Sequence, residues 1–193
     1  HTWHHKSCGQ CGHIPGYSTS IFWLHRKLGL EYLDPRDQTS CTAWNYYASA
    51  TSNAAAQAAV AMRNFSAAAE TTYFPIIHCA TSFGHYKETR QQLIHSPELR
   101  AQVRKILGRL GKKLIMPEEI VHYSEWVHAV RDRIAARQVR DMSHIRATAH
   151  LACHYHKLVG EDVVYAPEIY GAQRTAIVTA TLLALGIDVR DYS

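Results

Sequence analysis

The sequence predicts an α/β protein in which a parallel sheet carries helices on both faces. Short apolar segments alternate with longer segments that have the apolar periodicity of amphipathic helices. The chain is 47% hydrophobic and 19% charged, which is typical of a protein with an ordered core. Because strands joined through helices run parallel, this alternation indicates layers of strands and helices. With 193 residues, the chain has room for one large or two small domains of this class.

The first strands and the first helix are predicted from periodicity and from chain breakers. A short strand is expected before Cys8, followed by a helix over residues 18–27 whose apolar side chains share one face. Gly29 ends that helix, and residues 30–33 form the next strand. A loop rich in Asp and Pro then leads to Cys41.

An alanine-rich helix and a buried strand come next. Residues 48–70 are predicted to be helical, with Asn53 as a capping residue. Residues 73–78 are predicted to form a strand that ends at Cys79. The remaining predicted elements are helices at residues 86–95, 97–110, 117–137 and 171–185, and a strand at residues 144–151.

The pattern around the first cysteine recurs later in the chain. In the first copy a strand ends at Cys8, a helix follows, and a Leu-Gly pair precedes the next strand. In the second copy a strand ends near Cys153, and again a helix and a Leu-Gly pair follow. We therefore expect two tandem repeats, the first at residues 1–143 and a second, incomplete one at residues 144–193.

Four cysteines are predicted to meet at one edge of the sheet. Cys8 and Cys11 form a C-x-x-C pair in a glycine-rich loop directly after a strand. Cys41 and Cys79 also follow predicted strands, and the carboxyl ends of parallel strands gather at the same edge. Four thiolates suit a [4Fe–4S] cluster or a tetrahedral zinc ion. The sequence therefore predicts a metal site at this edge, with the cluster favoured over zinc.

Two other interpretations of these cysteines stay open. Cys41 and Cys79 are also compatible with small, buried hydrophobic side chains, a common role of cysteine. Cys8 and Cys11 alone would suit a metal-free thiol oxidoreductase. Such a site needs a helix that begins between its two cysteines, whereas Pro15 breaks the chain soon after them.

Charge and hydropathy restrict the compartment and the partners. Five cysteines cannot all pair within one chain, so we expect free thiolates and a cytoplasmic protein. No segment has the roughly 20 apolar residues of a membrane span. The net charge of +5 is not concentrated, and the densest basic cluster is expected to be a solvated helix face, so no nucleic-acid role is predicted. That cluster comprises Lys105, Arg109, Lys112 and Lys113.

The 14 histidines are not treated as a sign of metal binding. His4 and His5 are interpreted as part of a surface tract. Histidines that flank the cysteine-bearing loops are expected to be hydrogen-bonded or exposed rather than ligands. These are His13, His78, His85, His154 and His156.

The cysteine contexts resemble the CCG domain found in the B-type subunits of heterodisulfide reductases, a family with two tandem repeats of the form C…CC(G)…C-x-x-C. Ser40-Cys41 lies where the family has a Cys-Cys pair. The run from Cys79 to Ser82 is similar to the C-x-x-C motif with its last cysteine replaced. Cys153 matches the leading cysteine of the second repeat. The resemblance covers nearly the whole chain.

The resemblance implies an iron–sulfur subunit of a cytoplasmic heterodisulfide-reductase-like complex, an oxidoreductase that acts on sulfur groups and transfers electrons in sulfur metabolism. Cys8, Cys11, Cys41 and Cys79 would ligate a [4Fe–4S] cluster. Cys153 would belong to a noncubane [4Fe–4S] cluster in the second repeat, once that repeat is complete. The pattern is similar to the heterodisulfide-reductase-like B-type subunits of sulfur-oxidising prokaryotes.

The same resemblance implies partners. These are flavin-bearing and ferredoxin-like subunits of the complex, a lipoate-binding protein, and thiol or disulfide substrates. A second hypothesis is a zinc-stabilised interaction subunit without redox chemistry, in which the same four cysteines close a tetrahedral site and the metal contributes to folding.

Overall fold

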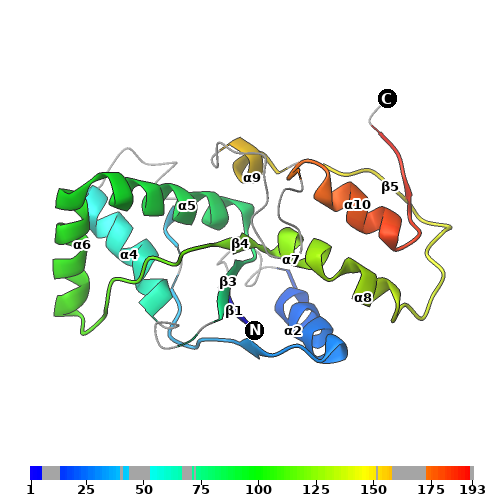
Figure 1. The fold of residues 1–193 in the computed structure, drawn as a ribbon, viewed down its shortest axis with the longest axis horizontal. Coiled ribbons are helices and arrows are strands. Elements are labelled where there is room, and N and C mark those ends of the chain that lie inside the picture. Colours follow the sequence, from blue (N-terminus) through cyan, green and yellow to red (C-terminus); the bar gives the residue numbers. More distant parts are fainter. Residues whose placement is uncertain are drawn as a thin grey trace.

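The computed structural model describes residues 1–5, 14–39, 41–43, 53–66, 71, 73–150, 152–157 and 173–191. A four-stranded, all-parallel sheet lies at its centre in the order β2-β1-β3-β4. Helices lie on both sides of this sheet (Figure 1), so the predicted α/β class is confirmed. The four strands are β1 (Thr2–His5), β2 (Tyr32–Leu33), β3 (Phe74–Ile77) and β4 (Val121–His122).

Eight helices are described, together with a second, two-stranded sheet. The helices are α2 (Tyr17–Leu28), α4 (Ala54–Ser66), α5 (Ala80–His95), α6 (Pro97–Arg109), α7 (Tyr123–Ala129), α8 (Arg131–Ala135), α9 (Cys153–Lys157) and α10 (Ile177–Ala184). The second sheet pairs β5 (Arg146–Ala147) with β6 (Asp188–Val189) in parallel. None of the described helices is both long enough and apolar enough to cross a lipid bilayer.

The two faces of the central sheet are covered by different helices, and β1 alternates between them. Trp3 and His5 point to the face of α4 and α5, where the Trp3 ring packs edge-on against Phe65 at 5.5 Å. Thr2 and His4 point to the opposite face, toward α2. Both faces of β1 are buried. The side chains of successive residues therefore alternate between two layers of helices, and not between the core and the solvent.

Several predicted boundaries are confirmed by capping contacts. The side chain of Asn53 accepts a hydrogen bond from the Ala56 amide at 3.1 Å, which caps α4. Ser96 caps α6 in the same way, accepting from the Leu99 amide at 3.2 Å. Gly29 ends α2 in the left-handed conformation at φ 65°, as a C-terminal glycine does. The predicted helical residues 48–52 and 67–70 lie outside the described part of the chain.

The prediction of one helix over residues 117–137 is wrong. This segment contains the edge strand β4 and the two short helices α7 and α8. Val121 pairs with Ile76 of β3, so tertiary pairing overrides the local helical pattern. A capping box then starts α7: the His122 side chain accepts from the backbone of the first turn, and Glu125 accepts from the His122 amide at 2.8 Å.

Two further helix boundaries differ from the prediction. Helix α5 begins at Ala80 rather than at residue 86, which makes Cys79 its N-terminal capping residue. Helix α10 is shorter than the predicted residues 171–185, because the described residues 173–176 form a turn and not an α-helix.

A buried ion pair attaches the C-terminal segment to the first part of the chain. Arg174 Nε lies 3.2 Å from Glu125 Oε1, and both side chains are 1% exposed. The Tyr155 hydroxyl donates to the same carboxylate oxygen at 2.8 Å. The Arg174 guanidinium also lies over the rings of Phe83 and Tyr155, at 5.6 and 5.1 Å. Burial raises the pKa of Glu125, and the nearby Arg174 opposes that shift.

We expect Arg174→Leu to lower the free energy of unfolding by about 3–5 kcal/mol, because it leaves the buried Glu125 carboxylate without its cation. The matched control is Arg190→Leu, which breaks a pair with Asp188 whose side chains are 65% and 37% exposed. Exposed pairs contribute about 0–1 kcal/mol, so the control should remain close to the wild type. Urea unfolding followed by circular dichroism measures both, and equal losses in the two variants would contradict the expectation.

Candidate functional site

The carboxyl edge of the sheet gathers the loops that carry cysteine. Strand β3 leads through His78 to Cys79, and the loop after β2 leads to Cys41. Strand β1 ends at His5, which pairs in register with Ile77 at the end of β3. The predicted meeting of strand ends at one edge is therefore confirmed for these described segments.

Cys41 contacts Ser82, and this contact is the central observation at the site. The two side chains come from the loop after β2 and from the first turn of α5, and Cys41 Sγ lies 3.0 Å from Ser82 Oγ. The Ala43 amide also donates to Cys41 Sγ at 3.4 Å. Cys41 is 6% exposed and Ser82 is 1% exposed. The Cys41 sulfur is thus shielded from solvent and has the Ser82 hydroxyl and the Ala43 amide as polar neighbours.

Cys79 lies at the start of α5, three residues before Ser82. Its backbone carbonyl accepts the first hydrogen bond of the helix, from the Phe83 amide at 2.9 Å. Cys79 therefore caps the helix through its backbone, and its side chain makes no capping hydrogen bond. The Cys79 side chain is partly exposed, in contrast to Cys41.

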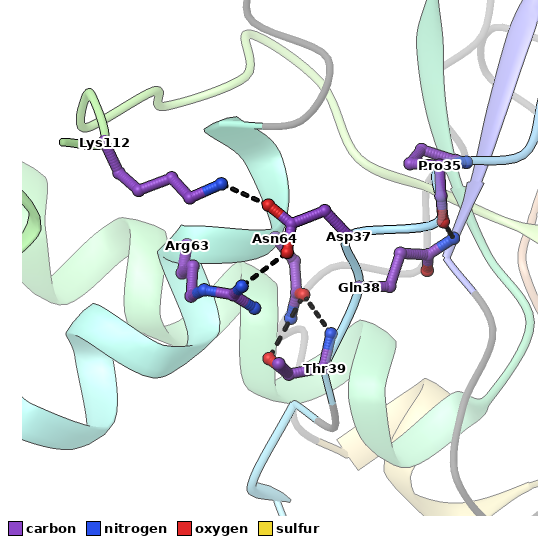
Figure 2. Close-up of polar contacts among 7 residues, drawn as sticks. All are labelled: Pro35, Asp37, Gln38, Thr39, Arg63, Asn64 and Lys112. Carbon is purple, nitrogen blue, oxygen red and sulfur yellow. Dashed lines mark hydrogen bonds and ion pairs between the residues drawn. The ribbon is translucent and has the colours of Figure 1, made fainter. Parts of the chain in front are cut away.

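The loop that carries Cys41 is fixed by polar contacts on both sides (Figure 2). Asn64 of α4 accepts from the Thr39 amide at 2.9 Å and from the Thr39 hydroxyl at 3.3 Å. Gln38 donates to the backbone carbonyls of His4 and Pro35, both at 2.8 Å. These contacts bind the loop to the sheet and to α4 immediately before Cys41.

Asp37 adds an ionic contact to the same loop. Its carboxylate lies 2.5 Å from Arg63 Nη2 and also pairs with Lys112. The hydrogen bond from Lys112, together with Arg63, lowers the pKa of Asp37. Lys112 therefore does more than contribute to the solvated basic face predicted for it, because it holds this loop from the far side of α4.

Behind the loop, a buried chain of polar groups connects three elements. The Asn64 amide donates to the Tyr86 hydroxyl at 2.9 Å, and that hydroxyl donates to His5 Nε2 at 3.0 Å. Asn64, Tyr86 and His5 are all fully buried. Burial lowers the pKa of His5 to about 4, so its imidazole is neutral at pH 7. A neutral ring nitrogen can accept the hydrogen bond from the Tyr86 hydroxyl without a charge being buried.

His85 contacts the cysteine loop from α5. Burial lowers the pKa of His85 to about 4, and a hydrogen bond with the backbone of Cys41 opposes the shift. His85 lies one helical turn after Ser82, so both side chains reach the same loop from one face of α5.

Cys8 and Cys11 lie outside the described residues, but the chain on either side of them is placed. His5 pairs with the end of β3, and the Tyr17 hydroxyl at the start of α2 donates to the His78 carbonyl at 3.2 Å. Both flanks of residues 6–13 thus lie beside the residue that precedes Cys79. His13, also predicted near the site, is among the residues that are not described.

Cys153 is exposed at the start of α9. Its neighbour His154 places Nδ1 at 2.7 Å from the hydroxyl of Thr81, in the first turn of α5. Helix α9 packs along α5, which brings the fifth predicted cysteine to the same part of the molecule as Cys79. Arg174 and Glu125 hold the adjacent Tyr155 in place.

The described residues contain no group of three or more His, Cys, Asp or Glu side chains arranged to hold a metal ion. Two of the four predicted ligands, Cys8 and Cys11, are not among them. The described pair, Cys41 and Cys79, fits a thiolate-ligated group in residue type and placement, because Cys41 contacts Ser82 in the first turn of the helix that Cys79 caps.

A histidine cluster on the other face of the sheet is a feature that the sequence analysis missed. His4 Nδ1 lies 2.6 Å from His78 Nε2, and His4 Nε2 lies 3.1 Å from His25 Nε2. His25 Nδ1 donates to the Ile21 carbonyl at 3.0 Å, and the Thr2 hydroxyl lies 2.9 Å from His4 Nε2 and 3.1 Å from His25 Nε2. The His25 ring also stacks on Trp126 with 4.0 Å between centroids.

The surface tract expected at His4 and His5 is therefore wrong, since both side chains are 0% exposed. The sequence did contain a signal for this burial: in a strand, Trp3 and His5 share one face and Thr2 and His4 share the other. It was obscured because histidine is polar enough to suggest a surface, whereas here both ring nitrogens of His4 and the Nε2 of His5 lie within hydrogen-bond distance of other buried groups.

The fold and this edge define an α/β protein with a thiol-bearing site at the carboxyl ends of its parallel strands. No protein-family profile matches the chain. The chain is similar to the B-type subunit of the ferredoxin:CoB-CoM heterodisulfide reductase of Methanosarcina acetivorans, with 27% identity over 172 residues. The match covers 84% of this chain and 54% of that protein. The chain thus spans about half the length of this curated relative, and the similarity supports a relationship to B-type subunits of this kind.

We expect Asn64→Ala to expose Cys41 to alkylation, because it removes the buried acceptor that fixes Thr39. Loss of such a hydrogen bond is worth about 1–1.5 kcal/mol, which corresponds to a roughly tenfold faster reaction of Cys41. Iodoacetamide labelling followed by mass spectrometry measures the rate at each cysteine. The exposed Cys153 is the internal control. If alkylation became faster by the same factor at Cys41 and Cys153, the variant would be destabilised as a whole, and the proposed role of Asn64 in fixing the Cys41 loop would be contradicted.

The neutral state of His5 predicts a specific pH dependence. Between pH 6.5 and about 4, the unfolded chain carries a proton on His5 that the folded chain does not, so stability falls as the pH decreases. In His5→Gln, which keeps an acceptor for Tyr86, the slope of unfolding free energy against pH should decrease by up to about 1.4 kcal/mol per unit in this window. Chemical unfolding at several pH values measures the slope.

His95→Gln, a change at an exposed position on α5, is the control for loss of an imidazole. It should keep the wild-type slope. If His5→Gln also keeps that slope, the imidazole of His5 is not neutral in the folded protein and the assignment of its hydrogen bonds to Tyr86 fails.

Proposed function

We propose that this chain is an iron–sulfur redox subunit of a heterodisulfide-reductase-like complex, in which Cys8, Cys11, Cys41 and Cys79 ligate one [4Fe–4S] cluster. The observation that carries the proposal is the contact of Cys41 with Ser82, three residues after Cys79, in a chain similar over 84% of its length to a B-type heterodisulfide reductase subunit. In the pattern that the sequence resembles, positions 41 and 82 are both cysteine. A shared ligand site requires these two positions to lie close together, and they do.

The placement of the flanking chain supports the participation of Cys8 and Cys11. His5 pairs with Ile77, and Tyr17 contacts His78, so the described residues on both sides of positions 6–13 lie next to the strand end that leads to Cys79. Gln38 ties the Cys41 loop to the backbone of β1. The eight residues between His5 and Ile14 provide enough chain for both cysteines to reach the same edge, at about 3.3 Å per extended residue.

When bound, a [4Fe–4S] cluster supplies one-electron transfer. The residues of this chain would tune it. The Ala43 amide donates to Cys41 Sγ, and the Ser82 hydroxyl, 3.0 Å away, would donate to it once the sulfur is a ligand; such hydrogen bonds to ligating sulfurs raise the reduction potential. Cys41 is 6% exposed, so its sulfur is largely shielded from water.

The overall reaction proposed for the complex is reduction of a disulfide to two thiols, or its reverse. Reduction takes two electrons and two protons per disulfide, and the electrons would come singly from a ferredoxin-like or flavin-bearing partner subunit. Cys153 would be a ligand of a second, noncubane cluster in the second repeat, residues 144–193, once that repeat is complete. A lipoate-binding carrier and a role in sulfur oxidation in the cytoplasm belong to the same proposal.

A zinc-stabilised interaction subunit is the second candidate. It is favoured by the replacement of cysteine at position 82, since four thiolates close a tetrahedral zinc site without a fifth. In that case the metal would contribute to folding and not to redox chemistry.

The test is anaerobic purification followed by quantification of iron, sulfide and zinc and by an absorption spectrum. We expect about four irons and four sulfides per chain and a broad visible band. Cys41→Ser should remove most of the iron, because it removes a ligand, whereas Cys153→Ser should keep it, because Cys153 is not a ligand of the first cluster. One zinc per chain with no visible colour would overturn the redox proposal in favour of the zinc-stabilised candidate.

A further inference from the structure

A groove far from the cysteine edge has the composition of a protein-binding surface. It has a volume of about 670 Å³ and lies between α2, α8, the segment at residues 137–142 and the residue after α10. In Figure 1, α2, α8 and α10 lie at the end of the molecule opposite α4 and α6. Its apolar lining includes Trp23, Leu24, Ile134, Val139, Met142 and Leu185.

The groove is open rather than enclosed. Trp23 is 52% exposed and Val139 is 93% exposed, and Leu183 of α10, two residues before the lining residue Leu185, is 57% exposed. Sites for small molecules bury about 70–90% of the ligand surface. A lining exposed to this extent suits a long occupant that covers the groove along its length, such as a helix about 10 Å wide.

The charged side chains that line the groove all have one sign. Lys27, Arg137 and Arg140 line it, and none of the described residues that line it is acidic. Within the described part of the chain, none of these three cations has an ion-pair partner; Lys27 lies 5.4 Å over the Trp23 ring, and Arg137 donates to a backbone carbonyl. The adjacent Asp141 already uses both carboxylate oxygens to accept from the amide and hydroxyl of Ser143.

We propose that this groove binds an acidic amphipathic helix of a partner protein. The apolar face of the helix would cover Trp23 and Leu24, and its carboxylates would pair with Lys27, Arg137 and Arg140. Tryptophan and arginine are the residue types most enriched in the energetic centres of interfaces, and unpaired cations select an acidic partner through charge complementarity. The inference rests on the proposed function and deepens it, because it names the surface by which such a protein would meet another member of its complex.

The experiment measures fluorescence anisotropy with a labelled synthetic peptide of about five helical turns, roughly 18 residues, that has leucine and tryptophan on one face and glutamate on the other. A twin peptide with lysine for every glutamate tests the charge. We expect the acidic peptide to bind at least tenfold more tightly than its basic twin, and its affinity to fall as salt is added.

Two groove variants are paired with two controls. Trp23→Ala and the double variant Lys27→Glu, Arg140→Glu should each weaken binding at least tenfold. Leu110→Ala removes a side chain that is 59% exposed at the other end of the molecule, and Lys105→Glu with Arg109→Glu reverses two charges on α6; both controls should bind as the wild type does. Circular dichroism and thermal melting confirm that all variants fold.

Several outcomes would overturn the proposal. Equal binding of the two peptides, or no binding of either, rejects an acidic helix as the occupant. Binding of a soluble fatty acid such as decanoate that Trp23→Ala abolishes, without peptide binding, assigns the groove to a small amphiphile. A dimer seen by sedimentation that Trp23→Ala dissolves assigns it to a second copy of the chain. Iron content measured on the same samples separates the two proposals, since loss of iron leaves the peptide result unaffected.

Discussion

The position of Cys41 depends on a buried chain of hydrogen bonds that runs from Thr39 through Asn64 and Tyr86 to His5. Asn64, Tyr86 and His5 are fully inside the protein, where an unpaired polar group costs about 1–3 kcal/mol. These hydrogen bonds therefore stabilise one arrangement of the cysteine loop, and any arrangement that breaks one of them leaves a buried polar group unpaired. They fix β1, α4, α5 and the cysteine loop relative to one another, so the position of the Cys41 sulfur is set by groups that do not contact it.

The central sheet explains why so many histidines are buried. A parallel strand covered by helices on both faces would ordinarily be apolar throughout. In β1, His4 and His5 instead use opposite faces, and their ring nitrogens bond to groups on α2, on α5 and at the end of β3. Neutral imidazoles can both donate and accept, so they join elements on each face without burying a charge. His78 contacts His4 and directly precedes Cys79, so the cluster of His4, His25 and His78 lies next to the edge of the sheet that carries the cysteines.

The C-terminal segment is held by a different kind of interaction. Glu125 gathers Arg174, Tyr155 and the His122 amide around one carboxylate, and α10 packs on α7 and α8. A buried ion pair of this kind adds more to the uniqueness of the arrangement than to its stability. Together with the contact of His154 with Thr81, it brings Cys153 and the first cysteine site to one side of the molecule, while the apolar groove lies between the outer helices at the other end.

Periodicity and chain breakers alone determined the α/β class, β1, α2, the capping of α4 by Asn53, and the gathering of cysteine-bearing loops at strand ends. They are local properties, and parallel connectivity then fixes which ends of the strands meet. Only the tertiary structure decided that residues 121–122 pair as an edge strand, that α5 begins at Ala80, that His4 and His5 are buried, and that Ser82 contacts Cys41. Each of these depends on a partner that is distant in sequence. Pairing with β3 outweighs helix propensity at Val121, and polar partners across the sheet make burial of histidine favourable.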